Sequence, residues 1–140
     1  MDRAFLVMGG LLGLIGVALG AFGTHALRAR VPAERLATFE TGVRYQLWHA
    51  LALLAVAFVR SVGPLVRGAS SAYTPLVLGR NANLFGAIAG WLFVAGVVLF
   101  SGSLYALALT GERRWGMVAP AGGLCLLAGW ACVVLAALTV

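Results

Sequence analysis

Four apolar blocks, separated by short stretches that carry the charges, organise the chain. Three of the blocks are uncharged and about twenty residues or longer, which is the length of helix that crosses the hydrocarbon core of a bilayer. The remaining block, the second along the chain, is shorter and spans the membrane only if the polar residues beside it enter the membrane with it. The pattern predicts an all-α polytopic membrane protein, a single four-helix transmembrane domain over residues 1–140, with spans at about 4–23, 41–62, 84–109 and 117–139.

The connections between the blocks differ in their patterns. After Pro32, the apolar residues Leu36, Phe39 and Val43 recur at helical spacing among charged residues. This spacing predicts an interfacial amphipathic helix between spans one and two that runs into the second span. Repeated glycines and a proline interrupt residues 60–83, where we expect an irregular loop.

Composition agrees with a location in lipid. The chain is 62% apolar and 10% charged, whereas a soluble domain is about half apolar and a quarter charged. All ten basic residues are arginine, and the net charge is +6. The arginines lie between the apolar blocks, so we assign them to an anionic lipid surface and not to nucleic acid. Six of them fall in residues 24–44 and 110–116 against four on the other side, which predicts that both termini are outside.

Glycines in the first span fall along one face of the helix. They recur at alternating intervals of four and three residues, and small residues in such a row let another helix approach closely. We expect this face to pack within the domain, with a contact between copies of the chain as the alternative. The helix-packing residues are Gly9, Gly13, Gly16, Gly20 and Gly23.

An ungapped comparison indicates an internal repeat. Residues 10–27 match residues 90–107 at seven positions, and Gly16 aligns with Gly96. This similarity predicts two helical hairpins related by a parallel pseudo-repeat. In the same alignment His25 lies opposite Tyr105.

Many of the polar residues near the spans belong to one half of the bilayer. Four alternating spans bring the end of the first and third and the start of the second and fourth to the same side. Polar groups at membrane depth are costly unless they have partners, so this cluster is a candidate site. Its members are His25, Glu40, Arg44, Tyr45, Gln46, His49, Ser101, Ser103 and Tyr105.

The cluster matches no complete catalytic or cofactor site. Haem ligation by His25 and His49 requires both imidazoles to face one cavity, and no local motif supports it. A transition metal lacks a third good ligand unless Glu40 serves. Ser101 or Ser103 could act as a nucleophile with His49, but no triad spacing is recognisable. We therefore expect no catalytic residue, no metal and no cofactor.

Two roles are open for the histidines. In the first, both hydrogen-bond to backbone or tyrosine groups and fix the helix ends. In the second, His49 titrates near neutral pH and takes part in proton-coupled transport. Glu40 and Arg44 are one helical turn apart, and we expect them to pair at the entry to the second span.

Four motifs occur in order along nearly the whole chain: Gly20-Ala-Phe-Gly-Thr-His-Ala-Leu, Thr41-Gly-Val-Arg-Tyr-Gln-Leu-Trp-His, Leu99-Phe-Ser-Gly-Ser-Leu-Tyr and Ala119-Pro-Ala-Gly-Gly. Together they resemble the YgdD/YwdK-type small inner-membrane protein family, the domain of unknown function 423. That family usually shows Gly-Ala-His where this chain has Gly23-Thr-His25, so the histidine is kept. The resemblance implies four spans in the plasma membrane of a bacterium, the inner membrane if the cell is Gram-negative. It brings no established activity.

The sequence thus predicts an uncharacterised integral membrane protein with three candidate functions. The first is a non-enzymatic scaffold or accessory component with a dry interior, whose partners are the lipid bilayer and either a second copy or other membrane proteins. The alternative is a small transporter or channel for an anion or a proton-coupled solute that uses His25, Arg44 and His49. The third is an enzyme acting on a lipid or quinone beside Ser101, Tyr105 and His49.

Overall fold

The computed structural model describes residues 2–68 and 80–139, and these residues form helices and turns without a strand. Four helices are long and apolar enough to cross a membrane, as the sequence predicts. Two short helical elements accompany them in the connections. The elements are α1 (Asp2–Phe22), the π-helix η1 (Gly23–Leu27), α2 (Ala33–Gly68), α3 (Arg80–Thr110), the 3₁₀-helix η2 (Arg113–Met117) and α4 (Ala119–Leu138).

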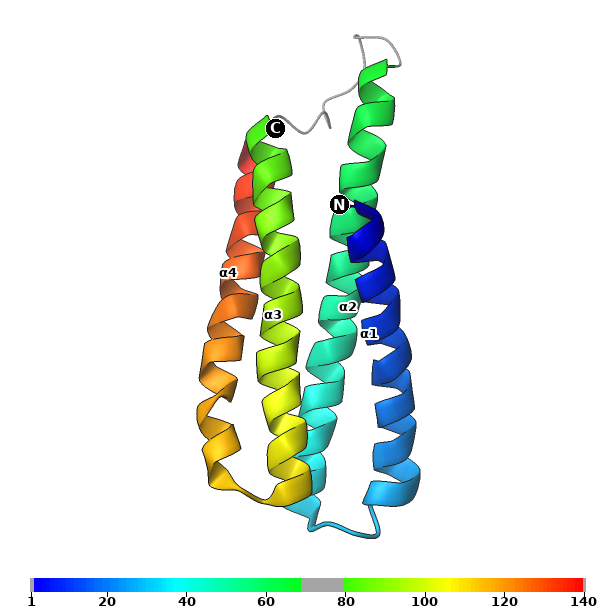
Figure 1. Ribbon diagram of the computed structural model, residues 1–140, viewed down its shortest axis with the longest axis vertical. Helices are drawn as coiled ribbons and strands as arrows, with labels where there is room; N and C mark the ends of the chain where they lie inside the picture. The colour runs from blue at the N-terminus through cyan, green and yellow to red at the C-terminus, as the bar shows by residue number, and fades with distance from the viewer. Residues whose placement is uncertain (1, 69–79, 140) are drawn as a thin grey trace.

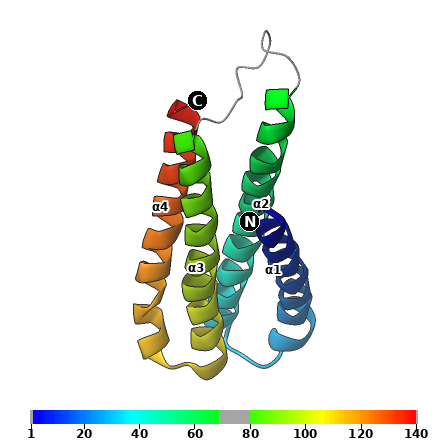
Figure 2. The same cartoon turned by 45° about the horizontal axis from the view of Figure 1, so that its top comes forward.

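The helices α2 and α3 form the centre of the domain, with α1 packed on α2 and α4 packed on α3 (Figure 1). The central helices are more buried than α1 and α4. The α1–α2 and α3–α4 connections lie at the same end of the molecule, the lower end in Figure 1, and Figure 2 shows the same arrangement after rotation. At the other end, Arg60 Nη1 on α2 donates a hydrogen bond to the carbonyl of Asn83 on α3.

The second span belongs to one helix of 36 residues that begins at Ala33. The segment predicted to be amphipathic is helical and runs into this span without a break. Its apolar face is turned inward, because Phe39 and Val43 are buried against Leu27 and Ala108. The segment is thus continuous with the second span, as the sequence predicts, and these contacts make it the first turns of a bundle helix.

The predicted irregular loop at 60–83 is wrong at both of its ends. Helix α2 continues through Gly63 and Pro64 to Gly68, and α3 already begins at Arg80. Membrane helices tolerate glycine and proline because neighbouring groups satisfy the backbone atoms that these residues free. Residues 69–79 of the predicted loop lie outside the described residues.

Helix α3 ends at a glycine in the left-handed conformation. Gly111 has φ of 76°, and its N–H donates to the carbonyl of Leu107 at 2.8 Å. Glycine adopts this conformation without a steric penalty and commonly ends helices in this way. The Arg35 side chain adds a second cap, since its Nε donates to the carbonyl of Ala108 at 2.7 Å. A basic side chain also interacts favourably with the negative end of the helix dipole.

The glycine row of α1 faces α2. A Cβ atom built on Gly16 would lie 2.7 Å from Leu47 Cδ2, and one on Gly23 would lie 3.2 Å from the Phe39 ring. Gly9 and Gly20 also approach α2, at Leu54 and Val43 respectively, whereas nothing lies within 4 Å of Gly13. The row therefore serves packing inside the domain at four of its five positions.

The two helical hairpins pack in the same register. Gly16 on α1 contacts Leu47 on α2, and the corresponding Gly96 on α3 contacts Leu126 on α4. Two further pairs of contacts repeat with the same spacing: Gly20 with Val43 corresponds to Phe100 with Gly122, and Gly9 with Ala50 corresponds to Ala89 with Gly129. These contacts support the parallel pseudo-repeat. The repeat does not extend to the polar residues, because Gln46 and His49 correspond to Cys125 and Ala128.

Candidate functional site

Gln46 on α2 joins three helices through one side-chain amide. The residue is 3% exposed. Its Nε2 donates a hydrogen bond of 2.7 Å to the carbonyl of Leu12 on α1. Its Oε1 accepts a hydrogen bond of 2.9 Å from the hydroxyl of Tyr105 on α3. Because Leu12 belongs to a regular helix, the donated bond is an additional contact to a backbone carbonyl and needs no break in α1.

His49, one turn further along α2, connects this helix to α4. The imidazole is buried, and Nδ1 lies 2.7 Å from the carbonyl of Tyr45. A carbonyl oxygen only accepts, so Nδ1 carries the proton. The unprotonated Nε2 then accepts a hydrogen bond of 3.2 Å from the indole Nε1 of Trp130 on α4. Both bonds fit the neutral imidazole, since a second proton on Nε2 would face the indole N–H.

Aromatic rings surround the histidine. The Tyr45 ring is stacked on the imidazole at a centroid distance of 6.0 Å and packs against Phe100 at 4.6 Å. The Phe93 ring lies 5.4 Å from the imidazole and 5.3 Å from the Trp130 indole. These contacts fill the space around the two hydrogen bonds of His49 with apolar surface, which strengthens hydrogen bonds by lowering the local dielectric constant.

The two serines of α3 do not assemble with His49. Ser101 and Ser103 are buried, and Ser103 Oγ donates to the carbonyl of Phe100 at 2.9 Å. Within residues 2–68 and 80–139, Ser101 Oγ has no hydrogen-bond partner. The acceptor atom that a general base would use, Nε2 of His49, is instead bonded to Trp130. The arrangement therefore lacks the contact through which a histidine activates a serine.

The remaining members of the predicted cluster lie on the outside of the helices. His25, Glu40 and Arg44 are exposed, and His25 belongs to the π-helix η1. The predicted Glu40–Arg44 ion pair is wrong, because no ion pair joins them in the described part of the chain. Arg44 Nη2 instead contacts Thr41 Oγ1 at 3.4 Å. Exposed charges gain little from pairing, so hydration competes well with an ion pair.

The nine predicted site residues thus separate into a buried or partly buried group on α2 and α3 and an exposed group on η1 and the N-terminal part of α2. His25 and His49 do not share a cavity, and the described residues hold no set of three His, Cys, Asp or Glu side chains that could bind a metal ion. Sequence reasoning missed Trp130, which is 47% exposed while its indole N–H donates to His49. It also missed Leu12, which takes part only through its backbone carbonyl, so its residue type gives no indication of the role.

Four apolar helices, joined at their centre by buried hydrogen bonds, define a small polytopic membrane protein. Residues 19–123 match the family described as "Protein of unknown function (DUF423)", and the chain belongs to this family. It is similar to the UPF0382 membrane protein YwdK of Bacillus subtilis, with 38% identity over 96% of each chain. It is also similar to the UPF0382 inner membrane protein YgdD of Escherichia coli K12, with 35% identity over 98% of this chain and 91% of the relative. No solved structure matches. The chain is a multi-pass protein of the bacterial plasma membrane, the inner membrane in a Gram-negative cell.

Proposed function

We propose that the protein is a non-enzymatic scaffold or accessory component of the membrane. The main support for this proposal is that buried polar side chains hydrogen-bond one helix to another. Gln46 bonds to α1 and α3, and His49 bonds to α4, so two residues of α2 reach every other long helix. These side chains serve as interhelical hydrogen bonds, a common use of polar residues in membrane bundles. A scaffold requires such a fixed shape and no movement of solute.

The outer surfaces of α1 and α4 are where other membrane components would pack. Both helices expose large apolar side chains along their length, for example Leu14 at 68% and Leu127 at 68%. In a bilayer these faces contact lipid chains or neighbouring membrane proteins at similar energetic cost, because lipid tails are as apolar as leucine. The proposal includes both kinds of neighbour and a second copy of the chain.

The transporter alternative receives less support from the geometry. It requires His25, Arg44 and His49 to act on one solute, but the first two are exposed and His49 is buried. The hydrogen bonds of His49 also engage both ring nitrogens, which leaves no ring atom for a passing proton unless a bond breaks first.

A flux measurement separates the two functions. We would reconstitute the full-length protein into liposomes loaded with a proton-sensitive or a chloride-sensitive dye, and compare the wild type with His49→Ala and with protein-free liposomes. A scaffold gives the protein-free leak rate in every sample, with gramicidin as the positive control for protons. Flux that is raised by the wild type and lowered by His49→Ala would contradict the scaffold and favour the transporter. Circular dichroism of the recovered liposomes verifies that both forms are folded.

A further inference from the structure

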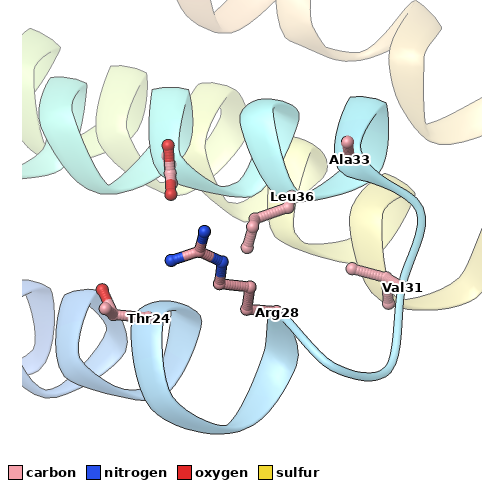
Figure 3. Close-up of a pocket in the computed structure, with 6 residues that line it drawn as sticks. Thr24, Arg28, Val31, Ala33 and Leu36 are labelled. Carbon is pink, nitrogen blue, oxygen red and sulfur yellow. The ribbon is translucent and has the colours of Figure 1, made fainter.

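A pocket of about 460 Å³ lies between η1 and the start of α2, apart from the buried hydrogen-bonded group. Its volume falls within the range of about 300–1,000 Å³ that is common for small-ligand sites. In Figure 3, the side chain of Arg28, directly after η1, reaches toward α2, Thr24 of η1 lies beside it, and Leu36 reaches back from α2 into the same space. The residues that line the pocket are Thr24, Arg28, Val31, Ala33, Leu36 and Glu40.

The pocket has one positive and one negative side chain. Neither Arg28 nor Glu40 forms an ion pair in the described part of the chain, where the ion pair that does occur joins Arg114 to Glu112 at 2.9 Å. Both charges are therefore available to a ligand. A guanidinium presents a fork of donors that matches phosphate oxygens. A carboxylate accepts hydrogen bonds from a primary ammonium group.

The first turn of α2 adds positive potential to the same pocket. The N–H groups of Ala33 and Glu34 have no carbonyl acceptor within the helix, because they belong to its first turn and no turn precedes it. Pro32 O already accepts the next two N–H groups, those of Arg35 and Leu36, at 3.0 Å each. Ala33, the first residue of the 36-residue helix, lines the pocket, so the positive end of the helix dipole lies next to it. Such an end favours an anionic group.

The position of the pocket favours a lipid as the source of this anion. It lies where α1 ends and α2 begins, at one end of the four spans, which is the depth of lipid headgroups. The adjoining surface of α1 is apolar and exposed, with Phe22 at 38% and Val17 at 65%. A headgroup in the pocket would leave its acyl chains free to lie along this surface.

We propose that this pocket binds the headgroup of a zwitterionic phospholipid that carries a primary ammonium, such as phosphatidylethanolamine. The phosphate lies at Arg28, the ammonium lies at Glu40, and the acyl chains follow the exposed face of α1. Phosphatidylethanolamine and a soluble headgroup compound such as glycerophosphoethanolamine share this chemistry, a phosphodiester with an aminoethyl group.

Lipid titration of the purified full-length protein in detergent, followed by native mass spectrometry, tests the proposal. The probes are phosphatidylethanolamine, phosphatidylcholine and phosphatidylglycerol with identical acyl chains. We expect the wild type to bind phosphatidylethanolamine about fivefold or more tightly than either other lipid. Glu40→Gln abolishes this preference, because the ammonium loses its carboxylate, and leaves phosphatidylglycerol binding unchanged or stronger. Arg28→Gln weakens both phosphatidylethanolamine and phosphatidylglycerol by about fivefold or more.

Matched controls are available in the two connections at this end of the molecule. Arg30 and Glu112 are exposed and do not line the pocket, so Arg30→Gln and Glu112→Gln keep wild-type affinities. Equal affinities of the wild type for all three lipids would overturn the proposal, and so would equal losses in the control variants. A further arm uses soluble glycerophosphoethanolamine as a competitor. Displacement of the lipid only at competitor concentrations far above the dissociation constant of the lipid supports a lipid site. Displacement by competitor at the same concentration as the lipid would overturn the proposal.

Discussion

Replacing Gln46 by methionine removes both interhelical hydrogen bonds of that side chain while keeping its length and nearly its volume. The substitution frees the carbonyl of Leu12 and the hydroxyl of Tyr105 from their partner. Hydrogen bonds between membrane helices contribute about 0.6 kcal/mol each on average and about 1.7 at most. Two bonds therefore predict a loss of about 1–3 kcal/mol in the free energy of unfolding.

The assay is unfolding in mixed micelles by increasing the fraction of sodium dodecyl sulfate, followed by circular dichroism. Leu51→Met is the matched control, because Leu51 lies on the same helix and is 65% exposed. We expect Gln46→Met to unfold at a clearly lower detergent fraction and Leu51→Met to unfold with the wild type. Unfolding of Gln46→Met together with the wild type would refute the role given to this residue.

A double-mutant cycle isolates the bond to α3. Tyr105→Phe alone removes one hydrogen bond and should cost about 0.6 kcal/mol. Once Gln46 is methionine, the hydroxyl of Tyr105 has already lost its acceptor, so adding Tyr105→Phe should cost almost nothing more. The two substitutions are then less than additive. Strict additivity would show that the two side chains do not interact, contrary to the 2.9 Å contact.

Other positions give further expectations, all measured in the same micelle unfolding assay. A Cβ on Gly122 would meet the backbone of Phe100, so Gly122→Ala should destabilise the protein by about 1–3 kcal/mol. Nothing lies within 4 Å of a Cβ on Gly102, so Gly102→Ala should be neutral or stabilising. Equal effects of the two substitutions would contradict this packing. Trp130→Phe keeps a ring but loses the bond to His49, and should cost about 0.6 kcal/mol, a cost that should vanish in a His49→Phe background. Arg35→Gln loses the charge at the end of α3 and should cost about 0.3–1 kcal/mol; a change that grows at high salt would argue against an electrostatic cap.

Hydropathy predicts the number and approximate depth of the spans because burial in lipid demands about twenty apolar residues whatever the packing is. Hydropathy does not predict where α2 begins, because it detects only the part of a helix that lies in lipid. Thr41 and Arg44 mark the start of the apolar run, but the helix itself begins at Ala33, since its outward side at the interface needs no apolar residue. A Gly-Pro pair likewise breaks the pattern without breaking the helix, since α2 continues to Gly68.

The candidate site was predicted by depth alone, and depth does not determine which way a side chain faces. Gln46 and His49 are three residues apart and lie on one side of α2, whereas Arg44 is rotated by about 200° from Gln46. This rotation explains why Arg44 is exposed while the other two are buried. The helical period of the buried residues could have separated the two groups. The partners on α1 and α4 could not be predicted, because they depend on the packing of one helix against another.

Ser101 reports whether the interior that the buried polar residues hold together is dry. This residue is fully buried and lies on α3, four residues before Tyr105. In a background in which Cys125 and Cys132 are alanine, Ser101→Cys and the exposed control Arg44→Cys would be treated in liposomes with a small, charged thiol reagent present on both sides. A dry interior predicts that Ser101→Cys stays unmodified while Arg44→Cys reacts to completion. Reaction of both cysteines at similar rates would reveal a water-filled path and contradict the scaffold.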